Sequence, residues 1–192
     1  AGATPVFCEV KDNNFCMDVN SAQRLVTNKT KAVMPVHLYG QACDMDTILD
    51  FAFNNNLFVV EDAAQGVGVR YDRIHTGTFG HLGVLSFYGN KTITCGEGGI
   101  VLTESKQLRD KVYQLKNHGR LKKGKFVHEE IGYNFSFTEM QAAVGVSQLK
   151  KLSAIKSKKK RIYDRYMEGL APISSELRPV WVDKKCDPVW WF

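Results

Sequence analysis

Residues 86–99 read SFYGNKTITCGEGG, a stretch in which a short apolar run gives way to a glycine-rich turn. The apolar run begins at Gly83 and predicts a buried strand, so Lys91 follows the carboxyl end of that strand. Working outward, strand-like segments at residues 57–60 and 100–103 alternate with helix-like segments along the chain. This alternation predicts an α/β domain with a largely parallel sheet. Ligands of such sheets lie at the carboxyl ends of the strands, and Lys91 stands at one of them.

Two further strands are predicted at residues 6–10 and 31–37. Asp44 is expected to cap a helix over residues 45–56, and Ser105 is expected to cap a helix that ends near residue 116, because both side chains accept hydrogen bonds from the first turn. These assignments place helices between the strands, as an α/β domain requires.

A third helix is predicted to begin at Thr138, which forms a capping-box pattern with Gln141, and to continue to Leu170. Its apolar residues recur at helical spacing, a pattern typical of a core or a dimer surface. Residues 1–170 are therefore expected to form a large domain, and residues 171–192 the beginning of a smaller one.

Composition narrows the class of protein. The chain has 192 residues and is 44% hydrophobic, enough for one domain with a core, and no stretch is apolar enough to cross a membrane. Five cysteines without C-x-x-C spacing favour a reducing, cytoplasmic location. The net charge of +6 is concentrated at residues 150–161, which fits a solvated helix face better than a nucleic-acid patch. No signal-peptide pattern is present, and both ends resemble the interior of a longer protein, so we expect a fragment.

Residues 61–65 read EDAAQ and follow the strand at residues 57–60. Asp62 is suited to hold a pyridine nitrogen protonated, and Lys91 is suited to form an imine with an aldehyde and then move a proton between carbon atoms. Ser86 can donate its hydroxyl to a phosphate, and Gln65 is one helical turn from Asp62. These are the groups that pyridoxal 5'-phosphate (PLP) requires from a protein, so the two motifs together predict a PLP enzyme.

Each residue also has an ordinary structural interpretation. An aspartate after a strand often caps a helix, a serine in an aromatic strand is often only packed, and residues 96–99 could form a plain tight turn. The joint occurrence of both motifs favours the cofactor. No metal site is predicted, because the five histidines show no metal spacing, and His118 is expected to be structural rather than catalytic.

The order of motifs resembles that of the DegT/DnrJ/EryC1/StrS sugar aminotransferases. The matching segments cover nearly the whole chain and are PVHLYGQ (35–41), DM (44–45), EDAAQ (61–65), SFYGNKTIT (86–94), GEGG (96–99), NHG (117–119), GYN (132–134) and QAA (141–143). Residues 89–94 most closely resemble GDP-perosamine synthases.

This resemblance implies fold type I of the PLP enzymes and a homodimer with active sites shared across its interface. It implies Lys91 as the imine lysine, Asp62 at the pyridine nitrogen, Gln65 near the ring and Ser86 at the phosphate. It also implies that Asn134 reaches the phosphate bound by the partner subunit. The implied reaction moves an amino group from glutamate to a keto carbon, C4, of a 6-deoxy nucleotide sugar.

Three departures from the family pattern stand out. Ser136 replaces an arginine, which removes a bidentate anion clamp, and His81 replaces an acidic residue. The family's segment before Ala1, with its Gly-Thr phosphate loop and ring-stacking aromatic, is absent, as is most of the small C-terminal domain. If these 192 residues act alone, we expect poor PLP retention and little turnover.

Three other functions are compatible with parts of the sequence. A PLP-dependent sugar dehydratase of the same family would carry histidine where Lys91 stands, which argues against it. An inactive fragment or PLP-binding remnant with a dimerising role is a non-enzyme alternative. A basic nucleic-acid-binding module would depend only on the lysine-rich helix.

Overall fold

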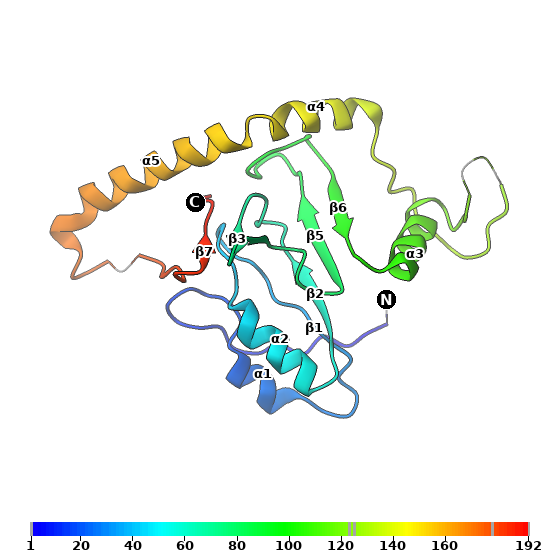
Figure 1. Ribbon diagram of the computed structural model, residues 1–192, viewed down its shortest axis with the longest axis horizontal. Coiled ribbons are helices and arrows are strands. Elements are labelled where there is room, and N and C mark those ends of the chain that lie inside the picture. The colour runs from blue at the N-terminus through cyan, green and yellow to red at the C-terminus, as the bar shows by residue number, and fades with distance from the viewer. Residues whose placement is uncertain (1, 123, 125, 178, 192) are drawn as a thin grey trace.

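The centre of the protein is a four-stranded sheet, which the computed structural model describes together with its surroundings over residues 2–122, 124, 126–177 and 179–191 (Figure 1). The strand order is β1 (Ala32–Val33), β2 (Phe58–Asp62), β5 (Leu82–Ser86) and β6 (Gly99–Leu102). β1, β2 and β5 are parallel, and β6 is antiparallel to β5. The expectation of an α/β domain with a mainly parallel sheet is confirmed.

One face of this sheet is covered by two helices, α1 (Val19–Leu25) and α2 (Met45–Asn54), which lie against each other. α2 begins as predicted, because the Asp44 side chain accepts a hydrogen bond from the Thr47 N–H. α1 was not expected, although Asp18 caps it in the same way. The buried apolar residues between α2 and the sheet are Val33, Phe51, Ala52, Leu57 and Val59.

The opposite face of the sheet is open among the described residues. Side chains alternate along a strand, so Phe58, Val84 and Val101 point away from the face that α2 covers. Their exposed fractions are 57%, 37% and 43%. The cluster of Ala63, Val67, Leu85, Phe87 and Ile93 extends the core on the covered side.

A second, three-stranded antiparallel sheet joins the C-terminal segment to the main body. Its order is β4 (Ile74–His75), β3 (Arg70–Tyr71) and β7 (Cys186–Asp187). Beyond β7 the chain passes so close to Gly40 that a Cβ there would lie 1.7 Å from the Val189 carbonyl oxygen. Residues 186–191 thus pack on the large domain, and the domain boundary at residue 170 stays a prediction.

The predicted helix from Thr138 to Leu170 is wrong as a single element. The capping box of Thr138 and Gln141 is present, but the chain forms α4 (Glu139–Leu149) and α5 (Leu152–Leu170) with a break between them (Figure 1). Lys151 has ψ of −2°, and its N–H donates to Gln148, three residues back, rather than four. A tight 3-10 turn therefore replaces one turn of α-helix.

The remaining helices follow the sequence closely. α3 (Lys106–Lys116) begins after Ser105, whose side chain accepts the Leu108 N–H. α5 ends before Pro172, and the 3-10 helix η1 (Ala171–Ile173) follows it. None of the helices described here has a run apolar enough to cross a lipid bilayer.

The strand predicted at residues 6–10 does not form. Only Val10 pairs, in an isolated bridge with Met17, and the Phe7 side chain is 87% exposed. A strand needs a neighbour to receive its backbone hydrogen bonds. The segment has the residue types of a strand, but no described strand lies beside it. The strand predicted at residues 31–37 forms as β1 followed by a bridge of Val36 with Asp62.

Candidate active site

Two of the predicted site residues end neighbouring parallel strands. Asp62 is the last residue of β2, and Ser86 is the last residue of β5. Asp62 is in register with Val84, so Ser86 lies two residues further along on the same face of the sheet. The fold thus places Asp62 and Ser86 on the open face, at the carboxyl edge where α/β sheets bind ligands.

The Asp62 carboxylate has one oxygen in use and one available. Oδ1 accepts a hydrogen bond from the Ala64 N–H at 3.0 Å. Oδ2 has no hydrogen-bond partner in the part of the chain that the structure describes, and the residue is half-buried. The expectation that Asp62 only caps the following turn accounts for one oxygen and leaves the other for a ligand.

Gln65 and Ser86 also use only part of their hydrogen-bonding capacity within the described chain. The Gln65 Oε1 accepts the Tyr39 N–H at 2.7 Å, whereas its amide NH₂ meets no acceptor among the described residues. The Ser86 Oγ accepts the Tyr88 N–H at 3.3 Å, which leaves its hydroxyl proton to be donated. Both side chains therefore retain a donor at or near the carboxyl edge.

Lys91 lies in the turn that follows β5, and its Nζ sits 4.6 Å from the centroid of the Trp191 ring. The Trp191 indole N–H donates to the Asn90 carbonyl oxygen at 2.9 Å, which fixes the ring beside the lysine. Lys91 makes no hydrogen bond or ion pair through Nζ with any described residue, Asp62 included. Among the described residues there is therefore no direct polar contact between Lys91 and Asp62, the two residues predicted to be catalytic.

The structure does not bring Asn134 to this edge. Asn134 is exposed and forms an isolated backbone bridge with Asn117, at the end of α3. It belongs to the segment of residues 126–137 that leads to α4, which we call the arm. Ser136, where the family resemblance implies an arginine, is also exposed on the arm.

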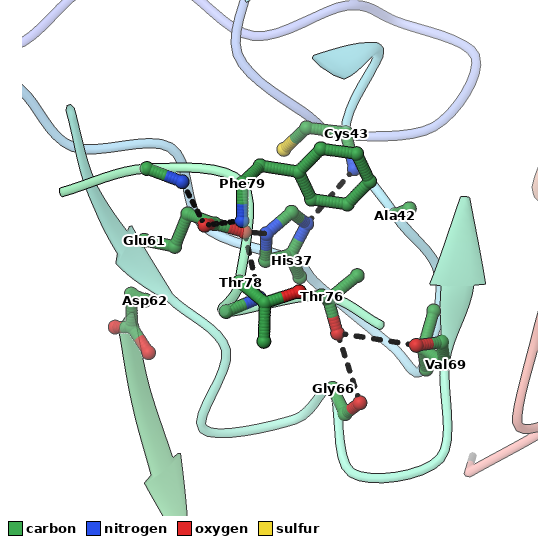
Figure 2. Close-up of polar contacts among 12 residues, drawn as sticks. His37, Ala42, Cys43, Glu61, Asp62, Gly66, Val69, Thr76, Thr78 and Phe79 are labelled. Atoms are coloured by element: carbon green, nitrogen blue, oxygen red, sulfur yellow. Dashed lines mark hydrogen bonds and ion pairs between the residues drawn. The ribbon is translucent and has the colours of Figure 1, made fainter. Parts of the chain in front are cut away.

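Sequence reasoning did not identify the residues beside Asp62 that carry the densest polar network. Glu61 and His37 are fully buried, and Figure 2 shows Glu61 pointing away from Asp62 across the strand. His37 Nε2 lies 3.0 Å from Glu61 Oε2. A glutamate inside a buried strand, followed by the glycine-rich residues 77–83, is the signal that could have revealed this network.

Burial by itself would raise the pKa of Glu61, but hydrogen bonds outweigh it. The His37 ring N–H and the backbone N–H groups of Gly80 and Gly77 all donate to the carboxylate, and together they lower its pKa below the usual value. Glu61 is therefore a buried carboxylate that stays ionised.

Two other histidines have structural roles. His81 Nδ1 accepts the Val59 N–H at 3.0 Å, and the His81 N–H donates to the Val59 carbonyl at 2.9 Å. A carboxylate could accept the same Val59 N–H, so histidine can take the place of the acidic residue that the family resemblance implies. His118 has a positive φ of 59°, and its carbonyl accepts a hydrogen bond from the His128 ring, as expected of a structural residue.

The lysine-rich helix α5 uses several of its charges within the chain. Lys156 donates to the Gly68 carbonyl and pairs with Asp187, Lys159 donates to the Trp191 carbonyl, and Lys160 pairs with Asp164. Burial lowers the pKa of Lys159. A phosphate-tracking surface needs these groups free, so α5 gives little support to nucleic-acid binding.

Comparison with known proteins identifies the family to which this chain is similar. The sequence profile of the DegT/DnrJ/EryC1/StrS aminotransferase family matches residues 1–192. The chain is 43% identical over 169 residues to the GDP-perosamine synthase of Escherichia coli O157:H7, covering 88% of this chain and 46% of that protein. It is 36% identical over 190 residues to the dTDP-3-amino-3,4,6-trideoxy-alpha-D-glucose transaminase of Streptomyces venezuelae, covering 98% of this chain and 49% of that protein.

Among solved structures, DesV of S. venezuelae in complex with a ketimine intermediate matches with a TM-score of 0.89 at 35% identity. The match covers 99% of this chain and 51% of that one. The chain spans about half the length of the relatives it matches.

Proposed function

The chain belongs to the DegT/DnrJ/EryC1/StrS aminotransferase family, and on that premise we propose that the whole protein is a nucleotide-sugar aminotransferase. It takes an amino group from glutamate and transfers it to the C4 keto carbon of a 6-deoxy nucleotide sugar. The cofactor is that of the family, pyridoxal 5'-phosphate. When bound, this cofactor supplies an aldehyde that accepts amines and a protonated ring that withdraws electrons from the substrate carbon.

The observation that carries this proposal is the set of unused polar groups at and near the carboxyl edge. Asp62 Oδ2, the Gln65 amide NH₂ and the Ser86 hydroxyl proton each lack a described partner. One acceptor for a ring N–H⁺ and donors for oxygen and phosphate are the groups this cofactor needs, so the residues fit it.

Each residue then has a distinct task. Lys91 would hold the aldehyde of the cofactor through its amine, which makes no described hydrogen bond, and the same amine could accept and return a proton. Asp62 holds the proton on the pyridine nitrogen, because an opposite charge within a few Å favours the charged form of both partners. Ser86 and Gln65 orient the phosphate and the ring.

The choice of a GDP-linked sugar and of C4 is supported by the E. coli relative, whose name is GDP-perosamine synthase. The Streptomyces relative, with a dTDP-linked 3-amino product in its name, covers more of the chain at lower identity. Ser136 cannot clamp an anionic group as arginine would.

A homodimer with shared sites is supported by the arm and α4. Ile131 and Met140 are 91% and 80% exposed, and Phe126, Phe135 and Val146 are exposed with them. Several exposed large apolar side chains on one segment and the helix that follows it are typical of an interface rather than of a solvated surface. Asn134 lies within this surface, as a residue that serves the partner's cofactor would.

The cofactor assignment is tested by chemical trapping. The protein is incubated with pyridoxal 5'-phosphate, reduced with borohydride and digested, and peptide mass spectrometry locates the modified lysine. We expect modification at Lys91, and we expect Lys91→Ala to lose both the modification and the visible band of the bound cofactor. Lys116→Ala is the matched control, because Lys116 also packs on an aromatic ring, 5.8 Å from the Tyr113 centroid. A band that survives in Lys91→Ala would show that the lysine is wrongly assigned.

The substrate is tested with GDP-, dTDP- and UDP-linked 4-keto-6-deoxy sugars and with their 3-keto isomers, with glutamate as donor. We expect the GDP sugar to be aminated and 2-oxoglutarate to accumulate in equal amount. A preference for a 3-keto sugar would correct C4 to C3. A protein that dimerises but takes up no cofactor would favour the alternative of a remnant with only a dimerising role.

A further inference from the structure

The Glu61 carboxylate is a buried charge to which the proposed reaction gives no role. Its Oε1 accepts the N–H groups of Phe79 at 2.7 Å and Gly80 at 2.6 Å. Its Oε2 accepts the Gly77 N–H at 2.6 Å and faces His37 Nε2 at 3.0 Å (Figure 2). Each carboxylate oxygen therefore has two partners, and the side chain is 0% exposed.

The protonation state of His37 follows from its other nitrogen. The Cys43 backbone N–H donates to His37 Nδ1 at 3.1 Å, so Nδ1 must carry a lone pair. The ring proton is then on Nε2, where it is donated to Glu61. The pair is a neutral imidazole bonded to a carboxylate, and the whole cluster holds a single negative charge.

Two backbone hydrogen bonds join Asp62 to the segment that carries His37. The Asp62 N–H donates to the Pro35 carbonyl at 2.9 Å, and the His37 N–H donates to the Asp62 carbonyl at 2.9 Å. His37 therefore contacts the end of β2 twice, once through its backbone at Asp62 and once through its ring at Glu61.

The turn at residues 77–80, which precedes β5, holds the Glu61 carboxylate from the side of that strand. Gly83, in register with Glu61, comes so close to this turn that a Cβ would lie 1.9 Å from the Gly77 carbonyl oxygen. Because Gly83 has no side chain, the turn packs directly against β5 and its N–H groups point at Glu61. Any rotation of the end of β2 that moved the Asp62 carboxylate would break several charge-assisted hydrogen bonds of Glu61.

We propose that Glu61 and His37 are positioning residues that hold the Asp62 carboxylate at the pyridine nitrogen of the cofactor. The inference rests on the proposed function, because it needs the ring nitrogen to be bound by Asp62. Glu61 and His37 touch neither cofactor nor substrate, and they act through the backbone of β2.

The test separates contact with the ring nitrogen from general damage to the fold. Affinity is measured for pyridoxal 5'-phosphate and for its 1-deaza analogue, in which C–H replaces the ring nitrogen. Asp62→Asn sets the scale, since it removes the charge that the natural cofactor alone can use. We expect Glu61→Gln to weaken binding of the natural cofactor about tenfold, because the Asp62 carboxylate is then misaligned with the charged ring nitrogen. Binding of the analogue, which lacks that nitrogen, should change by no more than about twofold.

A second pair of variants covers the case in which Glu61→Gln does not fold. His37→Asn keeps an acceptor for the Cys43 N–H and loses the donor to Glu61, whereas His37→Gln keeps the donor. We expect His37→Asn to show the selective loss and His37→Gln to restore much of it. Gln114→Leu is the control for stability, because Gln114 is a buried hydrogen-bonded side chain on α3.

The outcomes distinguish the two proposals. Equal weakening of cofactor and analogue in Glu61→Gln or His37→Asn, as in Gln114→Leu, would overturn the positioning role while Asp62→Asn still discriminates. If the wild-type protein and Asp62→Asn both fail to discriminate, the assignment of Asp62 is wrong and the inference is overturned with it.

Discussion

Replacing Glu61 by glutamine is expected to cost more stability than almost any other isosteric change in this chain. The carboxylate accepts two N–H groups at each oxygen, from Phe79 and Gly80 at Oε1 and from Gly77 and His37 at Oε2. Glutamine keeps one oxygen and turns the other into an NH₂ group. Whichever way the amide is oriented, two buried donors then face a donor.

The magnitude follows from that count. A buried donor without an acceptor costs about 1–3 kcal/mol, so two predict a loss of roughly 2–6 kcal/mol. His37 cannot relieve the conflict by moving its proton, because Nδ1 already accepts the Cys43 N–H. The loss is large beside the 5–15 kcal/mol or so that stabilises a typical domain.

The assay is urea unfolding followed by circular dichroism, with Glu97→Gln as the matched control. Glu97 is exposed in the turn at residues 96–99, and the same chemical change there should alter the free energy of unfolding by less than about 0.5 kcal/mol. A loss below about 1 kcal/mol for Glu61→Gln at an unchanged denaturant slope would refute the argument, because it would mean that the donors find other acceptors.

The pH dependence gives a second check on the same variant. The pKa of Glu61 is lowered in the folded protein, since burial is outweighed by the donors that surround it. A lowered pKa stabilises the fold fully above the ordinary pKa of glutamic acid, and this contribution is lost as the pH falls through the folded pKa. The difference between wild type and Glu61→Gln should therefore be constant near neutral pH and shrink in acid. A difference that grew in acid would contradict the assignment.

Three further changes, the last with a matched control, test other parts of the molecule. Asp62→Asn is expected to keep the cofactor attached and to lower the rate of sugar amination by about a hundredfold or more; near-normal turnover would exclude its role. Ile131→Lys places a charge in the exposed arm and should yield a monomer in sedimentation velocity, whereas a persistent dimer would move the interface elsewhere. Gly40→Ala, at φ +71° and with its Cβ 1.7 Å from the Val189 oxygen, should lower the free energy of unfolding by more than about 2 kcal/mol. Gly96→Ala, at φ +82° with open space around it, should cost only about 1 kcal/mol, and equal losses would show that backbone strain alone matters.

Elements whose signals are local were predictable from the sequence. Asp44, Ser105 and Thr138 each cap the helix that was expected to follow, because capping depends on the cap residue and the next few N–H groups. The break between α4 and α5 has no such signal, since lysine is a good helix former. It follows from packing, because Gln141 is bonded to the Glu97 carbonyl and Leu152 packs against the core beyond the break.

The same distinction applies to the candidate site. Asp62 and Ser86 could be placed because strand ends and sheet topology determine where they lie. The Glu61 network could not, because its partners come from His37, 24 residues earlier, and from a turn 16 to 19 residues later. Hydrogen bonds between segments that distant carry no periodic pattern in the sequence.

Adjacent carboxylates at the end of β2 have opposite environments because a strand alternates its side chains. Asp62 faces the open side with one oxygen available, and Glu61 faces the core with both oxygens occupied. An ionised carboxylate suits the core position because it only accepts hydrogen bonds, and every group around it donates. A neutral amide would add a donor to a site made of donors, and an apolar residue would leave three backbone N–H groups unsatisfied. The buried charge is therefore the residue type that lets the turn at 77–80, the His37 segment and β2 meet at one point, directly behind Asp62.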